Sequence, residues 1–314
     1  MEGAKNAPVV DVRFFGELED FLPPGKRGSD LSVELAGSPA VKDVIEGLGV
    51  PHPEIDAVTI NGRNATFGSR LAPGDRVEVF PDERDGDRGR QGGLKPPFDP
   101  ARGFILDVHL GKLARWLRLL GFDAMYRNDY SDHEIVETAA ARGRFILTCD
   151  IRLLMHGAVR GGRWIRERQP RRQLREVVGR LSLRSHFAPF TRCMLCNGLL
   201  EAVARDAVLD RVPPRAAERY DLFARCEDCG KVYWEGSHMG ACSLSSISRA
   251  SDDQKVRRPA VASASSRRFC AASGPPASVG WMLMKVGSFR PMKPSIVFRV
   301  GTTRSIASPP LPGP

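Results

Sequence analysis

Two cysteine pairs with the same internal spacing place the tightest constraint on how this chain can fold. Cys193 and Cys196 form one Cys-x-x-Cys pair, and Cys226 and Cys229 form a second pair after an interval of 29 residues. Each pair suits a tight turn that presents two thiolates to one ion, and two such turns complete a closed tetrahedral site with four cysteine ligands. A redox dithiol and paired disulfides are the alternatives. We predict a structural zinc in a ribbon that spans residues 190–240.

The composition is that of an ordinary folded protein. Of the 314 residues, 42% are hydrophobic and 27% are charged, which excludes a wholly disordered or collagen-like chain. Because no run of 18 apolar residues occurs, we predict neither a transmembrane helix nor a membrane partner. The first residues lack a basic segment followed by an apolar core, so we expect a cytoplasmic protein, where disulfides are disfavoured.

Changes in composition divide the chain into five segments. Residues 8–81 are compact in pattern, residues 82–100 are a linker rich in glycine, proline and charge, and residues 101–189 alternate strands with helices. After the ribbon, residues 241–314 are rich in Ser, Pro, Ala and Arg without periodicity, and we predict a mostly disordered tail. Residues 95–189 contain 18 Lys and Arg against 10 Asp and Glu, an excess that attracts polyanions if it forms one surface.

The first segment follows a β-β-α-β-β order. The predicted elements are strands at Val10–Phe15, Leu31–Leu35, Ala57–Ile60 and Arg76–Phe80, with a helix that begins near Pro39. This order and the final GDRVEVFP are similar to a β-grasp domain of the ubiquitin and sulfur-carrier type. We expect a binding or scaffolding module with a protein partner. Sulfur transfer is an alternative that would require cleavage at Gly92-Gly93.

Three aspartates stand where a parallel sheet would gather them. Asp107 follows the apolar strand Phe104–Leu106, Asp150 follows the strand Phe145–Thr148, and Asp132 lies in the first turn of a helix capped by Ser131. Sites in parallel α/β sheets form beyond the carboxyl ends of the strands. Converging carboxylates favour Mg²⁺ or Mn²⁺, which can activate water for attack on a phosphodiester. The alternative is that each aspartate only forms a turn or caps a helix.

Longer segments resemble a known family. The stretches FILDVHLGKLARWLRLLGFDAMYRND, SDHEIVETAAARGRFILTCD, PFTRCMLCNGLL and FARCEDCGKVYWEGSH are similar to the PIN-like RNase family named after the C-terminal part of the Mut-seven exonuclease. Many bacterial members carry an N-terminal ubiquitin-like domain. The resemblance implies a three-layer α/β fold with a parallel sheet and a metal-dependent ribonuclease site.

The resemblance also assigns residues. It places Asp107, Asp132 and Asp150 on the family's acidic positions, and it places Lys112 and Arg115 on a basic helix where they would contact phosphate. The family usually has a basic residue where this chain has Cys149. We therefore predict a metal-dependent ribonuclease. A noncatalytic RNA- or ribosome-associated binding module with a structural zinc ribbon is the alternative, since only three acids can be placed.

Overall fold

The computed structural model describes residues 8–81, 94 and 98–234. Most of the predicted linker, the Gly92-Gly93 pair, the last six residues of the predicted ribbon and the predicted disordered tail lie outside the described residues. Within the described part of the chain, no helix has the length and apolarity needed to cross a bilayer.

The N-terminal segment forms a five-stranded sheet with one α-helix, as the β-grasp prediction requires. The strands lie in the order β2-β1-β5-β3-β4, with β1 and β5 parallel at the centre. Their bounds are β1 (Val9–Phe14), β2 (Leu31–Glu34), β3 (Ile55–Ile60), β4 (Arg63–Ala65) and β5 (Arg76–Pro81), with helix α1 (Val41–Gly47) and the short 3-10 helices η1 (Gly16–Phe21), η2 (Pro24–Lys26) and η3 (His52–Glu54).

Alternation of apolar residues explains this sheet. Val10, Val12 and Phe14 on β1 are buried between exposed or half-buried neighbours, so that one face of the strand meets α1 in a single core. Strand β4 was not in the predicted order. It follows from the hairpin turn at Asn61 and Gly62, whose φ angles of 51° and 76° return the chain beside β3.

The second segment forms a four-stranded sheet, β7-β6-β8-β9, in which every pairing is parallel. The strands are β6 (Phe104–Leu106), β7 (Ala124–Met125), β8 (Phe145–Thr148) and β9 (Gly162–Trp164), and the helices are α2 (Gly111–Leu119), α3 (Asp132–Arg142), α4 (Ile151–Leu154) and α5 (Pro170–Arg180). Short 3-10 helices are η4 (Pro100–Arg102), η5 (Val108–Leu110) and η6 (Leu183–His186). Strands β6 and β8 have the predicted bounds.

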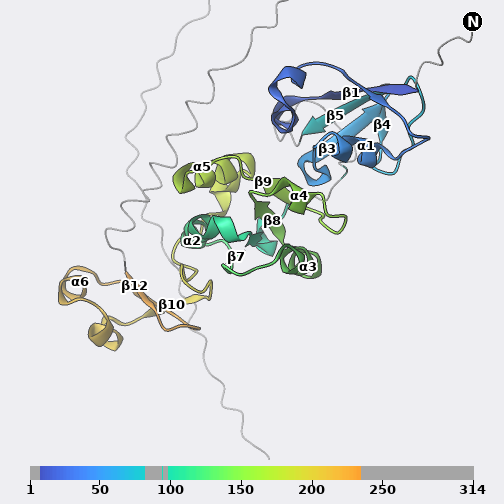
Figure 1. Cartoon of the computed structure of the whole chain (residues 1–314). Helices are drawn as coiled ribbons and strands as arrows, with labels where there is room; N and C mark the ends of the chain where they lie inside the picture. The colour runs from blue at the N-terminus through green and yellow to red at the C-terminus, as the bar shows by residue number, and fades with distance from the viewer. Residues whose placement is uncertain (1–7, 82–93, 95–97, 235–314) are drawn as a thin grey trace, which may run out of the picture. The chain divides into compact units, whose positions relative to one another are not determined.

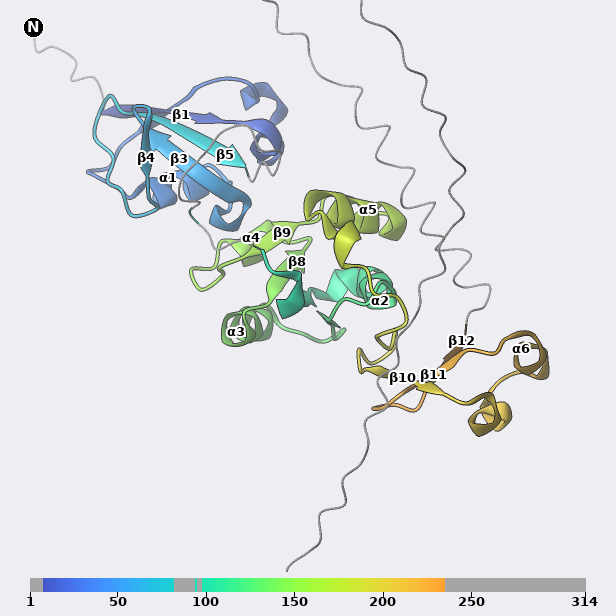
Figure 2. The same ribbon diagram turned by 180° about the vertical axis from the view of Figure 1, so that it is seen from behind.

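Two separate cores make this segment a three-layer structure. Phe104 and Leu106 of β6 point into a core with α2 and α5, whereas Ile105 between them points into a second core with α3 and α4. Figures 1 and 2 show these two helix pairs on opposite sides of the sheet. The strands are apolar on both faces because both faces are covered. This arrangement confirms the predicted PIN-like fold class.

The ribbon is a three-stranded antiparallel sheet. Its strands are β10 (Leu200–Val203), β11 (Phe223–Cys226) and β12 (Val232–Trp234), in that order across the sheet. Helix α6 (Pro214–Arg219) and the 3-10 helices η7 (Arg205–Ala207) and η8 (Leu209–Arg211) lie in the connection between β10 and β11.

A buried carboxylate joins the β-grasp segment to the outer strand of the parallel sheet. Glu54 of η3 is 0% exposed. Its side chain accepts hydrogen bonds from Arg163 Nη1 at 2.6 Å, from Arg180 Nη2 at 3.3 Å and from the backbone N–H of Trp164 at 2.6 Å. Both arginines also contact Glu17. Since a buried carboxylate is tolerated only when its hydrogen bonds are made, these contacts fix how the two segments meet.

We expect Glu54→Ala to lower the free energy of unfolding by about 3–5 kcal/mol, because it removes the buried carboxylate that accepts from the buried Arg163, the half-buried Arg180 and the Trp164 N–H. Urea denaturation followed by tryptophan fluorescence measures the change. The exposed Glu34 of β2 offers a control, Glu34→Ala, that should unfold like the parent. Equal stability of the two variants would contradict this assignment.

Candidate active site and metal centre

The carboxyl ends of β6 and β8 bring two of the predicted acids to one edge of the sheet. Leu106 pairs with Leu147 in parallel register, and the N–H of Asp107 donates to the Leu147 carbonyl at 3.2 Å. Asp107 therefore lies beside Thr148, and Asp150 follows two residues later. This is the convergence that strand alternation predicts for these two residues.

Protein donors hold the Asp107 carboxylate in one orientation. Its Oδ2 accepts from the Thr148 hydroxyl at 2.6 Å and from the Cys149 N–H at 2.5 Å, and its Oδ1 accepts from the His109 N–H at 2.9 Å. The residue is only 4% exposed. Among the contacts found for the described residues, none joins this carboxylate to a Lys or Arg side chain. Within the part of the chain that the structure describes, hydrogen bonds are what stabilise its negative charge.

Thr148 links the two aspartates and was not identified from the sequence. Its hydroxyl donates to Asp107 and accepts from the backbone N–H of Asp150 at 2.8 Å. Asp150 is exposed, and its Oδ1 caps α4 by accepting from the Arg152 N–H at 2.8 Å. Asp107 and Asp150 therefore both cap helices, which is the alternative role considered from the sequence. Capping uses only some of the oxygen lone pairs of each carboxylate.

Two acidic groups lie near Cys149 at this edge, Asp107 and Glu176. Desolvation and the negative charges of Asp107 and Glu176 raise the pKa of Cys149 to about 11. The thiol is neutral at pH 7, which removes it as a nucleophile. Glu176 was not predicted, and its carboxylate accepts from the backbone N–H groups of Arg166 and Glu167 just beyond β9.

The other predicted residues lie on helix surfaces. Asp132 is the exposed first residue of α3, next to a capping box in which Ser131 and Glu134 exchange both hydrogen bonds. Lys112 and Arg115 are exposed on α2. Asp107, Asp132 and Asp150 are not gathered as tightly as the cysteines: within the described ranges, only the four cysteines form a group of three or more ligands with all atoms within 4.8 Å.

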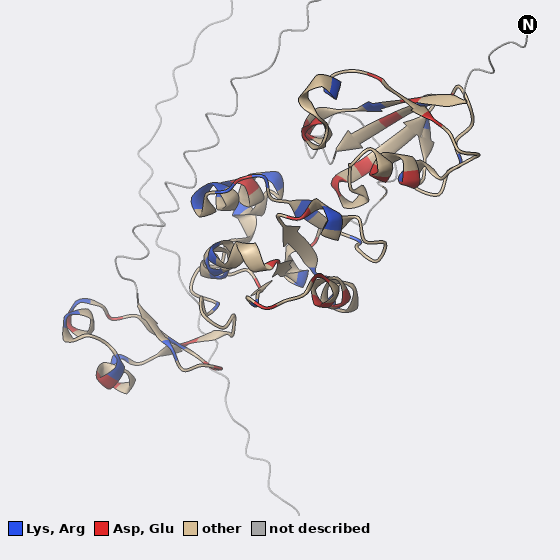
Figure 3. Cartoon of the chain, in the orientation of Figure 1, with Lys and Arg blue, Asp and Glu red and all other residues tan. Residues whose placement is uncertain are grey.

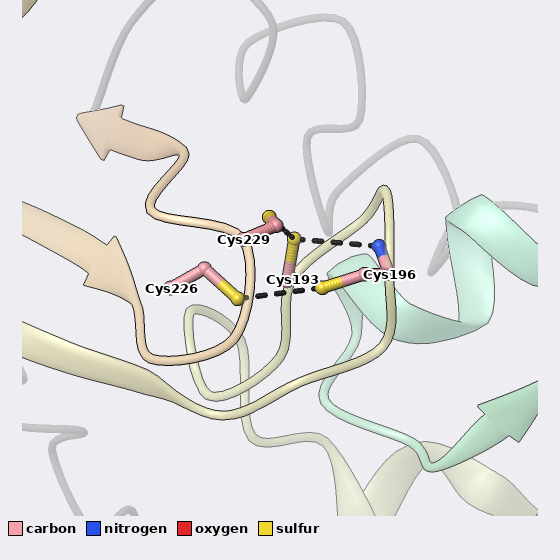
Figure 4. A group of neighbouring side chains, drawn as sticks. All are labelled: Cys193, Cys196, Cys226 and Cys229. Atoms are coloured by element: carbon pink, nitrogen blue, oxygen red, sulfur yellow. Dashed lines mark hydrogen bonds between the residues drawn. The ribbon is translucent and has the colours of Figure 1, made fainter.

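The four predicted cysteines converge as the spacing indicates (Figure 4). The sulfurs of Cys193 and Cys229 are 3.6 Å apart, and those of Cys196 and Cys226 are 3.4 Å apart. Tetrahedral zinc with bonds of about 2.3 Å separates its sulfur ligands by about 3.8 Å. The cluster could therefore hold a structural zinc after small shifts of the sulfurs, which all lie within 4.8 Å of one another, and four thiolates leave no position for a substrate.

Hydrogen bonds favour the ionised form of one thiol of this cluster, that of Cys193. Burial by itself opposes the thiolate of Cys193, but hydrogen bonds from the Cys196 N–H, the Tyr233 hydroxyl and the Leu195 N–H lower its pKa to about 6. The sulfur of Cys193 is 3.1 Å from the Tyr233 oxygen. Metal binding needs deprotonated cysteines, so these donors favour the ligand form at neutral pH.

The first cysteine turn docks on the outer strand β7 of the parallel sheet. Asn197 donates from Nδ2 to Asp123 at 2.8 Å, and its Oδ1 accepts from the Ala124 N–H at 3.0 Å. Arg118 of α2 is buried and donates to the carbonyls of Ala124 at 2.9 Å and Leu195 at 2.8 Å. Burial lowers the pKa of Arg118. A cation in a helix is expected to face solvent, yet the partners of Arg118 lie inside.

Two family models match the chain in order. The Mut7-C ubiquitin model matches residues 7–87, and the Mut7-C RNAse domain model matches residues 102–244. The segment at residues 102–244 belongs to the Mut7-C RNAse domain family. The resemblance drawn from the sequence motifs is thereby confirmed, including the N-terminal ubiquitin-like domain, and the match supports a function related to RNase activity. No curated protein matches the chain, and no solved structure matches it.

We expect Cys226→Ser to remove bound zinc from the purified full-length protein, which should otherwise contain about one zinc per chain, because one oxygen replaces a thiolate in a closed site. Elemental analysis measures the content. Cys149→Ser, which changes a thiol outside the cluster, should retain the metal. Zinc-free parent protein, or full zinc in the Cys226 variant, would contradict the assignment.

Arg118 should act on the zinc through the carbonyls that it holds. Arg118→Ala leaves the Leu195 carbonyl between two cysteine ligands without its donor, and loss of such outer contacts typically costs about 10- to 100-fold in metal affinity. Competition with a chromogenic chelator measures this affinity. Arg115→Ala, one turn away on the exposed face of α2, serves as the control and should bind zinc like the parent.

Proposed function

We propose that this protein is a metal-dependent ribonuclease that hydrolyses RNA phosphodiester bonds at the carboxyl edge of β6 and β8. The observation that supports this most is the buried Asp107 carboxylate, which has no cationic partner among the described contacts and is tied through Thr148 to Asp150. A fixed negative charge at a strand end has a clear use if a cation binds there.

The donor set fits Mg²⁺ or Mn²⁺. Asp107 Oδ1 and Asp150 Oδ1 each accept one N–H, so each keeps a lone pair, and no donor to Asp150 Oδ2 was found among the described residues. Mg²⁺ is commonly held by one or two carboxylates, with water and substrate phosphate completing its shell. We assign Asp107 and Asp150 as the principal ligands. The resemblance adds Asp132 as a third acid.

Each residue would have a separate task. The bound metal would lower the pKa of water and offset the charge that develops on the phosphodiester. Thr148 and the Cys149 N–H keep the Asp107 carboxylate aimed without reorganisation during the reaction. Lys112 and Arg115, exposed on the helix that follows Asp107, would bind the phosphates of the substrate.

A noncatalytic RNA-binding module is the second candidate. It is favoured by one observation, which is that the three aspartates are not gathered as closely as the cysteine ligands. In this function the basic residues would bind RNA and the ribbon would be structural. In both functions the β-grasp domain would offer its free surface to a protein partner, and the protein would work in the cytoplasm.

The decisive experiment incubates the full-length protein with labelled RNA, with and without Mn²⁺. We expect metal-dependent cleavage that falls by at least on the order of 100-fold in Asp107→Asn and in Asp150→Asn, since each removes an anionic ligand. Glu137→Gln alters an exposed acid on α3 and should cleave like the parent.

The two aspartate variants also separate a catalytic effect from misfolding. Asp150 is exposed, so its variant should keep the zinc content and urea midpoint of the parent even if Asp107→Asn does not. Cleavage by Asp150→Asn at the parental rate would remove this residue from the site. Absence of metal-dependent cleavage in the parent, with RNA binding retained, would select the noncatalytic module.

A further inference from the structure

The two helical layers of the RNase domain differ in charge. Helices α2 and α5 together contain one acid, Glu176, and its carboxylate is engaged by Arg180 and by backbone N–H groups beyond β9. Helix α3 in the opposite layer carries Asp132, Glu134 and Glu137. Figure 3 shows the contrast, with blue residues on α2 and α5 and red residues on α3.

Five residues form what we name the α2/α5 basic face: Lys112, Arg115 and Trp116 of α2, and Arg171 and Arg175 of α5. The four cations are exposed, and Trp116 is half-buried. The guanidinium of Arg171 lies 5.9 Å from the centre of the Trp116 ring. The residues from α2 and those from α5 are therefore side by side and form one face. No acidic partner of these four cations was found within residues 98–234.

This face begins at the edge that carries the aspartates. Lys112 is in the first turn of α2, which follows Asp107 through η5, and Arg171 is in the first turn of α5, which follows β9. Helices that follow parallel strands start at the carboxyl edge of the sheet. The first turns of both helices therefore adjoin Asp107 and Asp150, and Arg115 and Arg175 extend the positive charge away from them.

We propose that the α2/α5 basic face is the docking surface for single-stranded RNA, with phosphates bound by Lys112, Arg115, Arg171 and Arg175 and a base stacked against Trp116. The choice of RNA rests on the proposed function. The single-stranded form follows from the aromatic ring, because a base can stack on a side chain only when it is free of its partner strand. The uncompensated cations supply the attraction for the backbone.

Binding is measured apart from cleavage, by fluorescence anisotropy of a labelled 12-nucleotide RNA in buffer without Mg²⁺ or Mn²⁺. For Arg171→Ala with Arg175→Ala in the full-length protein, we expect about tenfold weaker binding. The plot of log affinity against log salt should lose about 1.4 from its slope, because each phosphate contact on a single strand contributes about 0.7.

Matched variants test the location of the face. The pair Arg142→Ala with Arg160→Ala removes the same charge from exposed positions outside α2 and α5, and it should leave the affinity less affected and the slope close to that of the parent. Trp116→Leu should weaken binding of the single strand but not of a duplex of the same length, whereas Trp116→Phe should retain most of the affinity.

The outcomes separate this inference from the proposed nuclease. RNA binding that is lost in the α2/α5 variants of a protein that never cleaves would support the face and reject the nuclease. Equal losses in the two arginine pairs, or no RNA binding by the parent, would overturn the face whatever the cleavage result. Equal loss of duplex and single-strand binding in Trp116→Leu would overturn the stacking role.

Discussion

The attachment of the ribbon to the parallel sheet depends on the hydrogen bonds of the Asp123 carboxylate. It receives two hydrogen bonds of 2.8 Å from Arg144 and one of 2.8 Å from Asn197. Burial alone would raise the pKa of Asp123, but these donors hold it below its usual value. The stabilisation is present at neutral pH and is lost only as the pH falls through that lowered pKa, so the first cysteine turn stays tied to β7.

Charged side chains serve the same purpose at the opposite edge of the sheet. There, Glu54 of η3 takes the place of water as the partner of two groups on β9, the Arg163 guanidinium and the Trp164 N–H. Such buried pairs add little net free energy, because desolvation offsets most of their attraction. Instead, they specify one arrangement of the β-grasp segment against the parallel sheet, since any shift would leave buried charges unpaired. Both outer strands, β7 and β9, are therefore covered by a neighbouring domain through polar contacts.

Local patterns predicted the elements whose stability is local. The strands β6 and β8 and the capping box at Ser131 follow from residues a few positions apart, and the convergence of the cysteines follows from two local Cys-x-x-Cys turns of matching spacing. Arg118 could not be placed in this way, since a helical pattern assigns a cation to solvent and its carbonyl partner at Leu195 lies 77 residues away. Glu54 and Asn197 escaped prediction for the same reason.

The sequence alone supports the zinc site of the cysteines more strongly than the Mg²⁺ or Mn²⁺ site of the aspartates. Four thiolates have few other uses at such spacing, whereas an aspartate after a strand is also a good helix cap, and Asp107 and Asp150 fulfil both roles. Capping fixes the orientation of each carboxylate but uses only some of its oxygen lone pairs. The edge carries the carboxylates of Asp107 and Asp150, while the adjoining α2/α5 basic face is positive. An anionic backbone would be repelled from this edge and attracted to this face, so a cation at the edge is what would let the two surfaces share one strand of RNA.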